Sequence, residues 1–271
     1  MTKPNTGLPW GTPEQIAEIC RRYKEGESAF NLAKSFGVSH APITRALRLG
    51  GVLKRTHSQA TTRHQCDHSF FNSIDSEAKA YWLGFLAADG GIMFGDTIRL
   101  ALAPYDRDHL ERWRAAIQAT QPVYESKHQS GYVHYGVNVT SQEMTSALAE
   151  FGIVQGKTFS IQWPELPSEM LRHFARGYSD GDGGFVIAAR GDVKFSVTSY
   201  KDLIEGFQSY LMRCCELRLT KLYARHKDSP HIVTMTYSGS NQVARIFHHL
   251  YDEATVFLPR KRDKIASRLS M

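Results

Sequence analysis

Two stretches of the sequence each run from apolar residues into an aspartate and then into glycine. The first, YWLGFLAADGGI, begins at Tyr81, and the second, HFARGYSDGDGGF, begins at His173. Each reads as a helix that ends at its acid, where the negative end of the helix macrodipole disfavours a carboxylate by about 0.3–1 kcal/mol. Aligning the Asp-Gly pairs sets Asp89 opposite Asp182, and 182 − 89 = 93 residues separate them. An unfavourable placement that occurs twice indicates a fold that needs an acid at both helix ends.

Small residues precede both acids at helical spacing. Gly84 and Ala88 lie four apart in the first stretch, and Gly177 and Gly181 lie four apart in the second. Residues at i and i+4 share one helix face, and small side chains there let two helix backbones approach closely. We therefore predict that the two helices pack side by side and bring both acids to one spot.

Two carboxylates at two negative helix ends repel one another, and a cation between them removes that repulsion. Oxygen ligands with several positions left open for water and phosphate suit Mg²⁺, with Mn²⁺ as a substitute. Such an ion bridging a phosphodiester activates water and stabilises the leaving oxygen. The pattern predicts divalent-metal hydrolysis of phosphodiesters, with the metal ligands Asp89 and Asp182. A single Asp-Gly helix end would indicate only a turn.

From about residue 69 onward, the chain reads as two copies of one unit. The first copy comprises helix 75–88, strand 97–103, helix 106–119, strands 122–127 and 132–140, and helix 141–151. The second comprises helix 168–181, strands 185–189 and 193–199, helix 201–214, strands 218–226 and 231–238, and helix 241–251. A lysine follows the last helix of each copy. Duplication at this long interval predicts a protein with pseudo-twofold symmetry.

The formal positive charge is confined to the first quarter of the chain. Residues 1–63 hold ten of the 33 Lys and Arg and four of the 27 Asp and Glu, a net charge of +6. The remaining residues hold 23 of each sign. This asymmetry indicates a basic module that touches a polyanion, joined to a larger module of balanced charge, although a solvated basic face explains the charge equally well.

The basic segment reads as three short helices, over about 13–26, 28–36 and 39–49, with a glycine-containing turn before the last. This spacing is typical of a helix-turn-helix, whose last helix enters the major groove. The segment resembles the DNA-binding ends of resolvases and phage regulators. Its candidate groove-facing residues are His40, Thr44, Arg45 and Arg48. A small helical protein-binding domain is the alternative.

The segments WLGFLAADG at 82–90 and ARGYSDGDG at 175–183 resemble the two signature helices of the LAGLIDADG homing endonucleases, in their monomeric two-repeat form. The similarity covers roughly residues 69–265 and includes the stretches that flank each helix. It implies an α+β fold of two pseudo-symmetric repeats, each with an antiparallel sheet that forms half of a DNA-binding saddle. With the helix-turn-helix, the expected division is 1–55 for the small all-α domain, 56–70 for a linker, 71–160 for repeat 1 and 161–271 for repeat 2.

The resemblance also implies roles for particular residues. Asp89 and Asp182 occupy the final acidic position of each motif and would be the metal ligands. Lys157 and Lys261 look like the basic residues that flank the scissile phosphates in this family, and Arg260 is a rival for the second place. We expect these lysines to be catalytic together with the two acids. The first motif departs from the second by carrying an alanine where Asp180 stands, but that earlier acid is not a metal ligand in the family.

Polar residues that alternate with apolar ones along the expected strands would face DNA. Lys221, for example, is followed by Leu222 and Ala224 at alternate positions, which predicts a polar-out, apolar-in strand. A solvated face of a half-buried sheet is an equal alternative for any one residue. The candidate DNA contacts are Arg99, Asn138, Lys194, Ser196, Thr198, Lys221, Tyr223, Arg225, Lys227, Thr234 and Thr236.

These observations predict a site-specific, Mg²⁺-dependent endonuclease that cuts both strands of DNA and is encoded by a mobile element or phage. It would act as a monomer on double-stranded DNA with a long asymmetric target site. The alternative is a non-cleaving transcription regulator or an RNA-splicing maturase on the same scaffold, but the presence of both acids and both lysines favours catalysis. No apolar stretch is long enough to span a membrane, and no signal peptide is visible. We therefore expect a cytoplasmic protein of a host cell or of a phage-infected bacterium.

Overall fold

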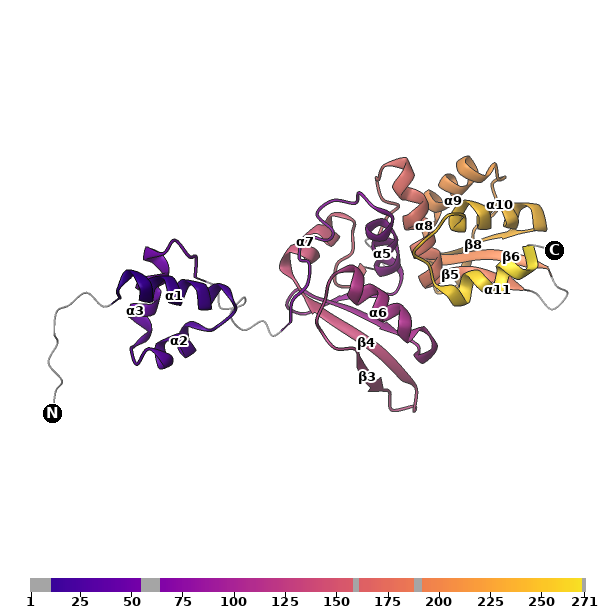
Figure 1. The fold of residues 1–271 in the computed structure, drawn as a ribbon. Coiled ribbons are helices and arrows are strands. Elements are labelled where there is room, and N and C mark those ends of the chain that lie inside the picture. Colours follow the sequence, from indigo (N-terminus) through magenta and orange to yellow (C-terminus); the bar gives the residue numbers. More distant parts are fainter. Residues whose placement is uncertain (1–10, 55–63, 158–160, 188–191, 270–271) are drawn as a thin grey trace. The chain divides into compact units, whose positions relative to one another are not determined.

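A computed structural model describes residues 11–54, 64–157, 161–187 and 192–269 (Figure 1). The chain divides into two compact units, Met1–Arg63 and His64–Met271. Each unit has its own apolar core. Among the described residues, no helix is long and apolar enough to cross a membrane.

The smaller unit is a bundle of three helices whose apolar residues meet in one core. The first helix starts with a capping box, in which Thr12 Oγ1 accepts from the Gln15 N–H and the Gln15 side chain accepts from the Thr12 N–H. Leu32 and Ile43 are fully buried between the helices. The three lie within the predicted ranges: α1 (Pro13–Lys24), α2 (Ala29–Ser35) and α3 (His40–Leu49).

Residues 64–70, which were expected to end a linker, belong instead to the larger unit. The Thr120 N–H donates to the Gln65 carbonyl oxygen at 2.9 Å, and the Gln65 N–H donates to Thr120 Oγ1 at 2.8 Å. Phe70 and Phe71 are buried in the core beside Trp113. Burial of two aromatic rings outweighs the polar composition of the residues before them. Residues 56–63 of the expected linker lie outside the described residues.

The larger unit repeats one order of elements, and each copy begins with an acid-bearing helix, α5 (Glu77–Ala88) or α8 (Ser168–Asp182). The first copy continues with β1 (Gly90–Met93), β2 (Thr97–Leu102), the short 3-10 helix η1 (Pro104–Asp106), α6 (Arg107–Ala116), β3 (Tyr124–Lys127), β4 (Val133–Thr140) and α7 (Gln142–Glu150). The second continues with β5 (Gly183–Ile187), β6 (Val193–Tyr200), α9 (Lys201–Cys215), β7 (Tyr223–His226), β8 (Ser229–Ser238), α10 (Ser240–Tyr251) and α11 (Pro259–Leu269). The sequence predicted all of these except β1, η1 and α11.

The two copies build equivalent antiparallel sheets, with the strand orders β1-β2-β4-β3 and β5-β6-β8-β7. One face of each sheet is apolar and lies under helices, α6 and α7 in the first copy and α9 and α10 in the second (Figure 1). Ile98 and Leu100 alternate inward along β2, and Val233 and Met235 do so along β8. The predicted α+β class with two pseudo-symmetric halves is confirmed.

The expected strand 218–226 is shorter than predicted, and its expected alternation is wrong. Strand β7 covers only Tyr223–His226, and all four residues are exposed, Ala224 included. β7 is the edge of its sheet, and a register shift between Ala224 and His226 breaks its alternation. Lys221 precedes the strand and Lys227 lies in the turn after it.

Candidate active site

The two acid-bearing helices pack directly against each other through their small residues. Gly84 of α5 and Gly177 of α8 each lie against the backbone of the opposite helix. Nearer the acids, a Cβ added to Gly181 would stand 2.3 Å from Ala88 Cβ and 3.4 Å from Asp89 Oδ2. The structure thus places all four small residues at the contact between the helices, and the absence of bulk at Gly181 leaves room for the Asp89 carboxylate.

Both acids lie at the ends of these helices. Asp89 is the C-cap of α5, and Asp182 is the last residue of α8. Their side chains reach solvent, yet protein atoms surround them on most other sides. Desolvation, helped by repulsion from the Asp182 carboxylate, raises the pKa of Asp89 to about 6. Burial also raises the pKa of Asp182, against the opposing charges of Lys157 and Lys261.

A lysine closes the end of each acid-bearing helix. Lys157 Nζ donates to the carbonyl oxygens of Leu86, Ala88 and Gly90 at 3.0, 2.8 and 2.5 Å. Lys261 Nζ donates to the carbonyl oxygens of Ser179, Gly181 and Gly183 at 3.2, 2.7 and 2.7 Å. Adding 93 to each number of the first set gives the second set, so the two lysines hold equivalent places. Each brings a positive charge to a negative helix end and offsets the cost of the acid there.

Arg260 is adjacent to Lys261 in the sequence, but its side chain has other partners. Its guanidinium forms a two-point ion pair with Asp106, with Nε to Oδ1 at 3.0 Å and Nη2 to Oδ2 at 2.8 Å. It also lies over the ring of Tyr105, 4.8 Å from its centre. Arg260 therefore links the second repeat to η1 of the first. The side chain that bonds the carbonyl oxygens at the end of α8 is that of Lys261.

The donor set at the paired helix ends fits a hard divalent cation. It consists of carboxylate oxygens, whose mutual repulsion a cation would relieve. In the part of the chain that is described, no group of three or more His, Cys, Asp and Glu side chains surrounds a possible metal position. An ion at Asp89 and Asp182 would therefore keep several coordination positions for water and phosphate oxygens.

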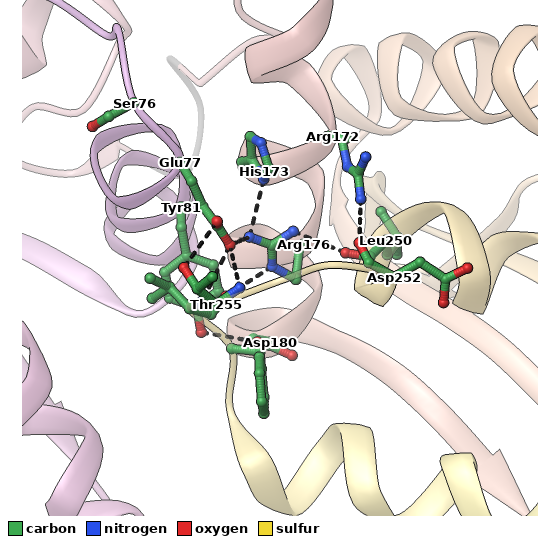
Figure 2. Close-up of polar contacts among 12 residues, drawn as sticks. Ser76, Glu77, Tyr81, Arg172, His173, Arg176, Asp180, Leu250, Asp252 and Thr255 are labelled. Atoms are coloured by element: carbon green, nitrogen blue, oxygen red, sulfur yellow. Dashed lines mark hydrogen bonds and ion pairs between the residues drawn. The ribbon is translucent and has the colours of Figure 1, made fainter.

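Two further buried groups, Arg176 and Asp180, join α8 to α5, and their contacts are drawn in Figure 2. Arg176 is fully buried and forms an ion pair with Glu77 of α5, with Nη2 to Oε1 at 2.5 Å. Asp180, 1% exposed, accepts from the Tyr81 hydroxyl of α5 at 2.8 Å. No role was predicted for either residue from the sequence, although a charged side chain inside an apolar helix stretch is itself a signal of a buried partner.

On the outer face of the first sheet, Arg99 and Asn138 are neighbours across β2 and β4. Arg99 Nη2 contacts His134 Nε2 at 3.1 Å, and the Tyr124 hydroxyl donates to Asn138 Oδ1 at 3.3 Å. Neither His134 nor Tyr124 was predicted from the sequence to face DNA. His134 lies four residues before Asn138 in β4 and therefore on the same face, so strand periodicity was a usable signal.

The outer face of the second sheet carries a polar cluster. Ser196 lies opposite Thr236, and Thr198 lies opposite Thr234 with their hydroxyl oxygens 2.8 Å apart. Lys194 is exposed on the same face, while Phe195 and Val197 between them are buried. Tyr223 of β7 pairs with Thr234, and Arg225 is exposed on the same edge strand.

A cavity of about 200 Å³ lies between this face, Asp182 and α11. Arg260, Lys261 and Lys264 line it together with Ser196 and Thr198. Lys264 was not among the predicted site residues, because α11 was not predicted as a helix. The cavity places three cationic side chains beside one of the two acids.

In the smaller unit, the four candidate residues lie on α3. His40, Arg45 and Arg48 are exposed, and Thr44 is half-buried. The Thr44 hydroxyl donates to the His40 carbonyl oxygen at 3.2 Å. The opposite side of α3 is buried through residues such as Ile43 and Leu47. The basic side chains therefore lie on the side of α3 that faces away from the apolar core of the smaller unit.

Comparison with known proteins identifies the fold of the larger unit. No protein-family model and no curated protein matches the sequence. Among solved structures, the homing endonuclease I-WcaI bound to its DNA recognition sequence matches 70% of this chain and 87% of its own, with 11% identity and a TM-score of 0.51. The I-SmaMI LAGLIDADG homing endonuclease bound to cleaved DNA matches 69% and 86% of the two chains, with 12% identity and a TM-score of 0.46. The N-terminal LAGLIDADG domain of DUF199/WhiA matches 73% and 94%, with 12% identity and a TM-score of 0.45. Of these three, the first carries the inference of a shared fold.

Proposed function

We propose that this chain, whose larger unit has the two-repeat LAGLIDADG fold, is a divalent-metal-dependent endonuclease that cuts both strands of DNA at a specific site. The observation that carries the proposal is the pair Asp89 and Asp182, brought together at two helix ends that each electrostatically disfavour an acid. A scaffold gains nothing in stability from this placement, so it is better explained by a bound cation and the chemistry that the cation serves.

Asp89 and Asp182 would hold the metal, Mg²⁺ or Mn²⁺ in its place. When bound, such an ion supplies activation of water and charge stabilisation of the leaving oxygen in phosphodiester hydrolysis. The carboxylates must be ionised to bind it, and the raised pKa of Asp89, about 6, allows this at neutral pH. Protonation of Asp89 competes with metal binding, so metal affinity and cleavage are expected to weaken as the pH falls below about 6.

The two lysines would act through their charge and not as bases. An ammonium group has three N–H donors, and those of Lys261 bond the carbonyl oxygens of Ser179, Gly181 and Gly183. Lys157 is bonded in the same way in the first repeat. Each ammonium therefore stabilises negative charge that develops on the phosphate beside it.

The outer faces of the two sheets would bind the duplex. Arg99, Lys194 and Arg225 would supply phosphate contacts. Asn138 and the facing hydroxyl pairs Ser196–Thr236 and Thr198–Thr234 would reach base edges. The helix α3, with Arg45 and Arg48, would add further contacts through the smaller unit. Arg99 pairs with Gly91, and Ser196 pairs with Gly184, which is the equivalent glycine because 91 + 93 = 184. The two faces therefore carry different side chains at this equivalent place, which supports a long asymmetric target and a monomeric enzyme.

The test is cleavage of a random or genomic DNA library with and without Mg²⁺. Wild type is expected to cut both strands at one sequence in the presence of the metal. Asp89→Asn and Asp182→Asn are expected to bind that sequence and leave it uncut. Tight binding of one sequence by wild type without cleavage, with Mg²⁺ or Mn²⁺ present, would instead favour a non-cleaving regulator or maturase.

A further inference from the structure

Asp180 is a buried carboxylate that the proposed chemistry does not use. It accepts hydrogen bonds from the Tyr81 hydroxyl at 2.8 Å, the Tyr251 hydroxyl at 2.6 Å and the Leu258 N–H at 2.7 Å. These three donors satisfy an acidic group that is costly to bury alone. One side chain thus joins four segments, namely α5, α8, the end of α10 and the residue before α11.

The hydrogen bond from Leu258 connects Asp180 to Lys261 through a single intervening residue. The Leu258 N–H donates to Asp180, and the Leu258 carbonyl oxygen accepts from the Lys261 N–H at 3.0 Å in the first turn of α11. Lys261 Nζ then reaches back to the carbonyl oxygens of Ser179 and Gly181, the two neighbours of Asp180. These contacts form a closed loop between α8 and α11. The Asp180 carboxylate holds the start of α11 and therefore also sets where the Lys261 ammonium contacts α8.

The rest of the connection between α10 and α11 is held by the second buried group (Figure 2). Glu77 Oε1 accepts from the Thr255 N–H at 2.8 Å and the Val256 N–H at 3.1 Å. Arg176 Nε donates to the Val256 carbonyl oxygen at 2.8 Å. Leu258 is the last anchored residue of this connection before α11 begins.

The first repeat places its lysine by another route. The residue equivalent to Asp180 is Ala87, because 87 + 93 = 180. Lys157 follows the last residue of α7 by seven positions (157 − 150), whereas Lys261 follows the last residue of α10 by ten (261 − 251). Lys157 sits in a tight turn, in which its N–H donates to the Val154 carbonyl oxygen at 3.1 Å. The longer connection of the second repeat is therefore anchored by a carboxylate of α8. The shorter connection of the first repeat has no such anchor on α5, where the equivalent residue is Ala87.

We propose that Asp180 is a positioning residue for Lys261. Its carboxylate fixes Leu258 and thereby sets the place of the Lys261 ammonium. The position of Lys261 at the end of α8 therefore depends on Asp180, whereas the position of Lys157 at the end of α5 does not. The unequal effect on the two DNA strands rests on the proposed endonuclease function, whereas the anchoring of Leu258 does not.

The first experiment measures cleavage of each strand of an end-labelled target duplex by the full-length chain with Mg²⁺. Lys157→Met and Lys261→Met identify the strand whose cut depends on each lysine. Asp180→Ala is expected to slow cleavage by about tenfold or more on the same strand that Lys261→Met affects, because small misplacements of a catalytic group have large effects on rate. Asp180→Asn is expected to act in the same direction but less, since a neutral oxygen accepts a weaker hydrogen bond than a carboxylate.

Gln208→Ala is the matched control. Gln208 is also a buried polar residue of the second repeat, 3% exposed, and it donates to the Thr220 carbonyl oxygen, away from the α10–α11 connection. Its loss is expected to leave the ratio of the two cuts unchanged. Where Lys261→Met slows one strand more than the other, an unchanged ratio of the two cuts in Asp180→Ala would overturn the proposal.

The second experiment does not need cleavage. Hydrogen exchange of the Leu258 amide is measured in the metal-free, full-length protein and is expected to be about tenfold faster or more in Asp180→Ala, with a smaller increase in Asp180→Asn. An unchanged rate would overturn the proposal, even if wild type cuts DNA. If wild type cuts no DNA, the proposed function fails and this exchange still decides the positioning. In the case where Lys261→Met slows both strands equally, the exchange of the Leu258 amide is again the deciding measurement. If the alanine variant does not fold, Asp180→Asn replaces it in both experiments.

Discussion

Gly84 and Gly177 occupy equivalent places on the two acid-bearing helices, and each lies against the backbone of the other helix. A Cβ on Gly84 would stand 2.1 Å from the Phe174 carbonyl oxygen, and a Cβ on Gly177 would stand 2.0 Å from the Tyr81 carbonyl oxygen. Carbon and oxygen atoms that are not bonded to each other do not approach so closely, so any side chain here would force the helices apart. This reciprocal contact sets the separation of the helix ends and therefore of the two acids.

We predict that Gly84→Ala and Gly177→Ala each lower the free energy of unfolding of the larger unit by about 1–3 kcal/mol, the usual cost of overpacking. The rate of metal-dependent cleavage should also fall under conditions where both variants are still folded, because the acids move with the helix ends. Chemical denaturation and cleavage rates would measure the two effects. Gly91→Ala is the control, since a Cβ there meets no atom within 4 Å, and its effect should stay within about 0.5 kcal/mol. Equal effects of all three changes would contradict the packing argument.

The sequence was sufficient to locate the helix contact because its signals are local. Small residues four apart and an acid before glycine can be read within one helical turn or two. The duplication already places a lysine after the last helix of each copy, but the catalytic role of these lysines came from the resemblance. The role of Lys157 and Lys261 as caps for helix carbonyls depends on contacts about 70–80 residues apart in the sequence. No pattern near either lysine indicates which carbonyl oxygens it bonds.

The remaining parts of the site escaped prediction for different physical reasons. Glu77 and Arg176 pair across 99 positions, and the local contact of Arg176 with His173 gives no indication of that pairing. The alternation predicted around Ala224 failed because an edge strand is not required to bury one face. Helix α11 begins at Pro259, a favourable first position, but its many charged residues hid the apolar side that carries the buried Ile265.

Asp89→Asn is predicted to stabilise the metal-free protein at neutral pH. The pKa of Asp89 in the folded state, about 6, is higher than its ordinary value of 3.8. The folded state therefore binds the proton more tightly, and the charged carboxylate destabilises it above pH 6. The stability gain of the variant should be full above pH 6, shrink as pH falls, and vanish below about pH 4. Its size is about 1 kcal/mol at most, because solvent screens an exposed carboxylate.

Thermal unfolding in EDTA at pH 4, 5 and 7.5 would measure this gain as the difference between Asp89→Asn and wild type. Comparing the two proteins at each pH cancels the contributions of other titrating groups. A difference that does not depend on pH, or a loss of stability at pH 7.5, would contradict the electrostatic account of the paired acids.

Breaking the buried ion pair between Glu77 and Arg176 should be strongly destabilising. Arg176→Met or Glu77→Gln is expected to cost about 3–5 kcal/mol, because each leaves buried polar groups without their partner. The double variant should cost clearly less than the sum of the two, and a double-mutant cycle in urea would measure the difference. Lys201 and Glu205, an exposed pair 3.6 Å apart, provide the control cycle, with a coupling below about 1 kcal/mol. Additive effects in the Glu77–Arg176 cycle would show that the two side chains are not energetically coupled.

The smaller unit is predicted to bind the DNA backbone through α3. Replacing both Arg45 and Arg48 by glutamine should make the slope of log binding constant against log salt shallower by about 2, since each phosphate contact contributes about 0.9. Binding titrations of the full-length protein between low and physiological salt would measure the slope. Lys34→Gln is the control, because it removes a charge from an exposed position on α2 and should change the slope by less than half a contact. If the Lys34 change lowers the slope as much per charge as the α3 changes, the unit acts through its overall positive charge, and the assignment of α3 as the DNA-contacting helix is wrong.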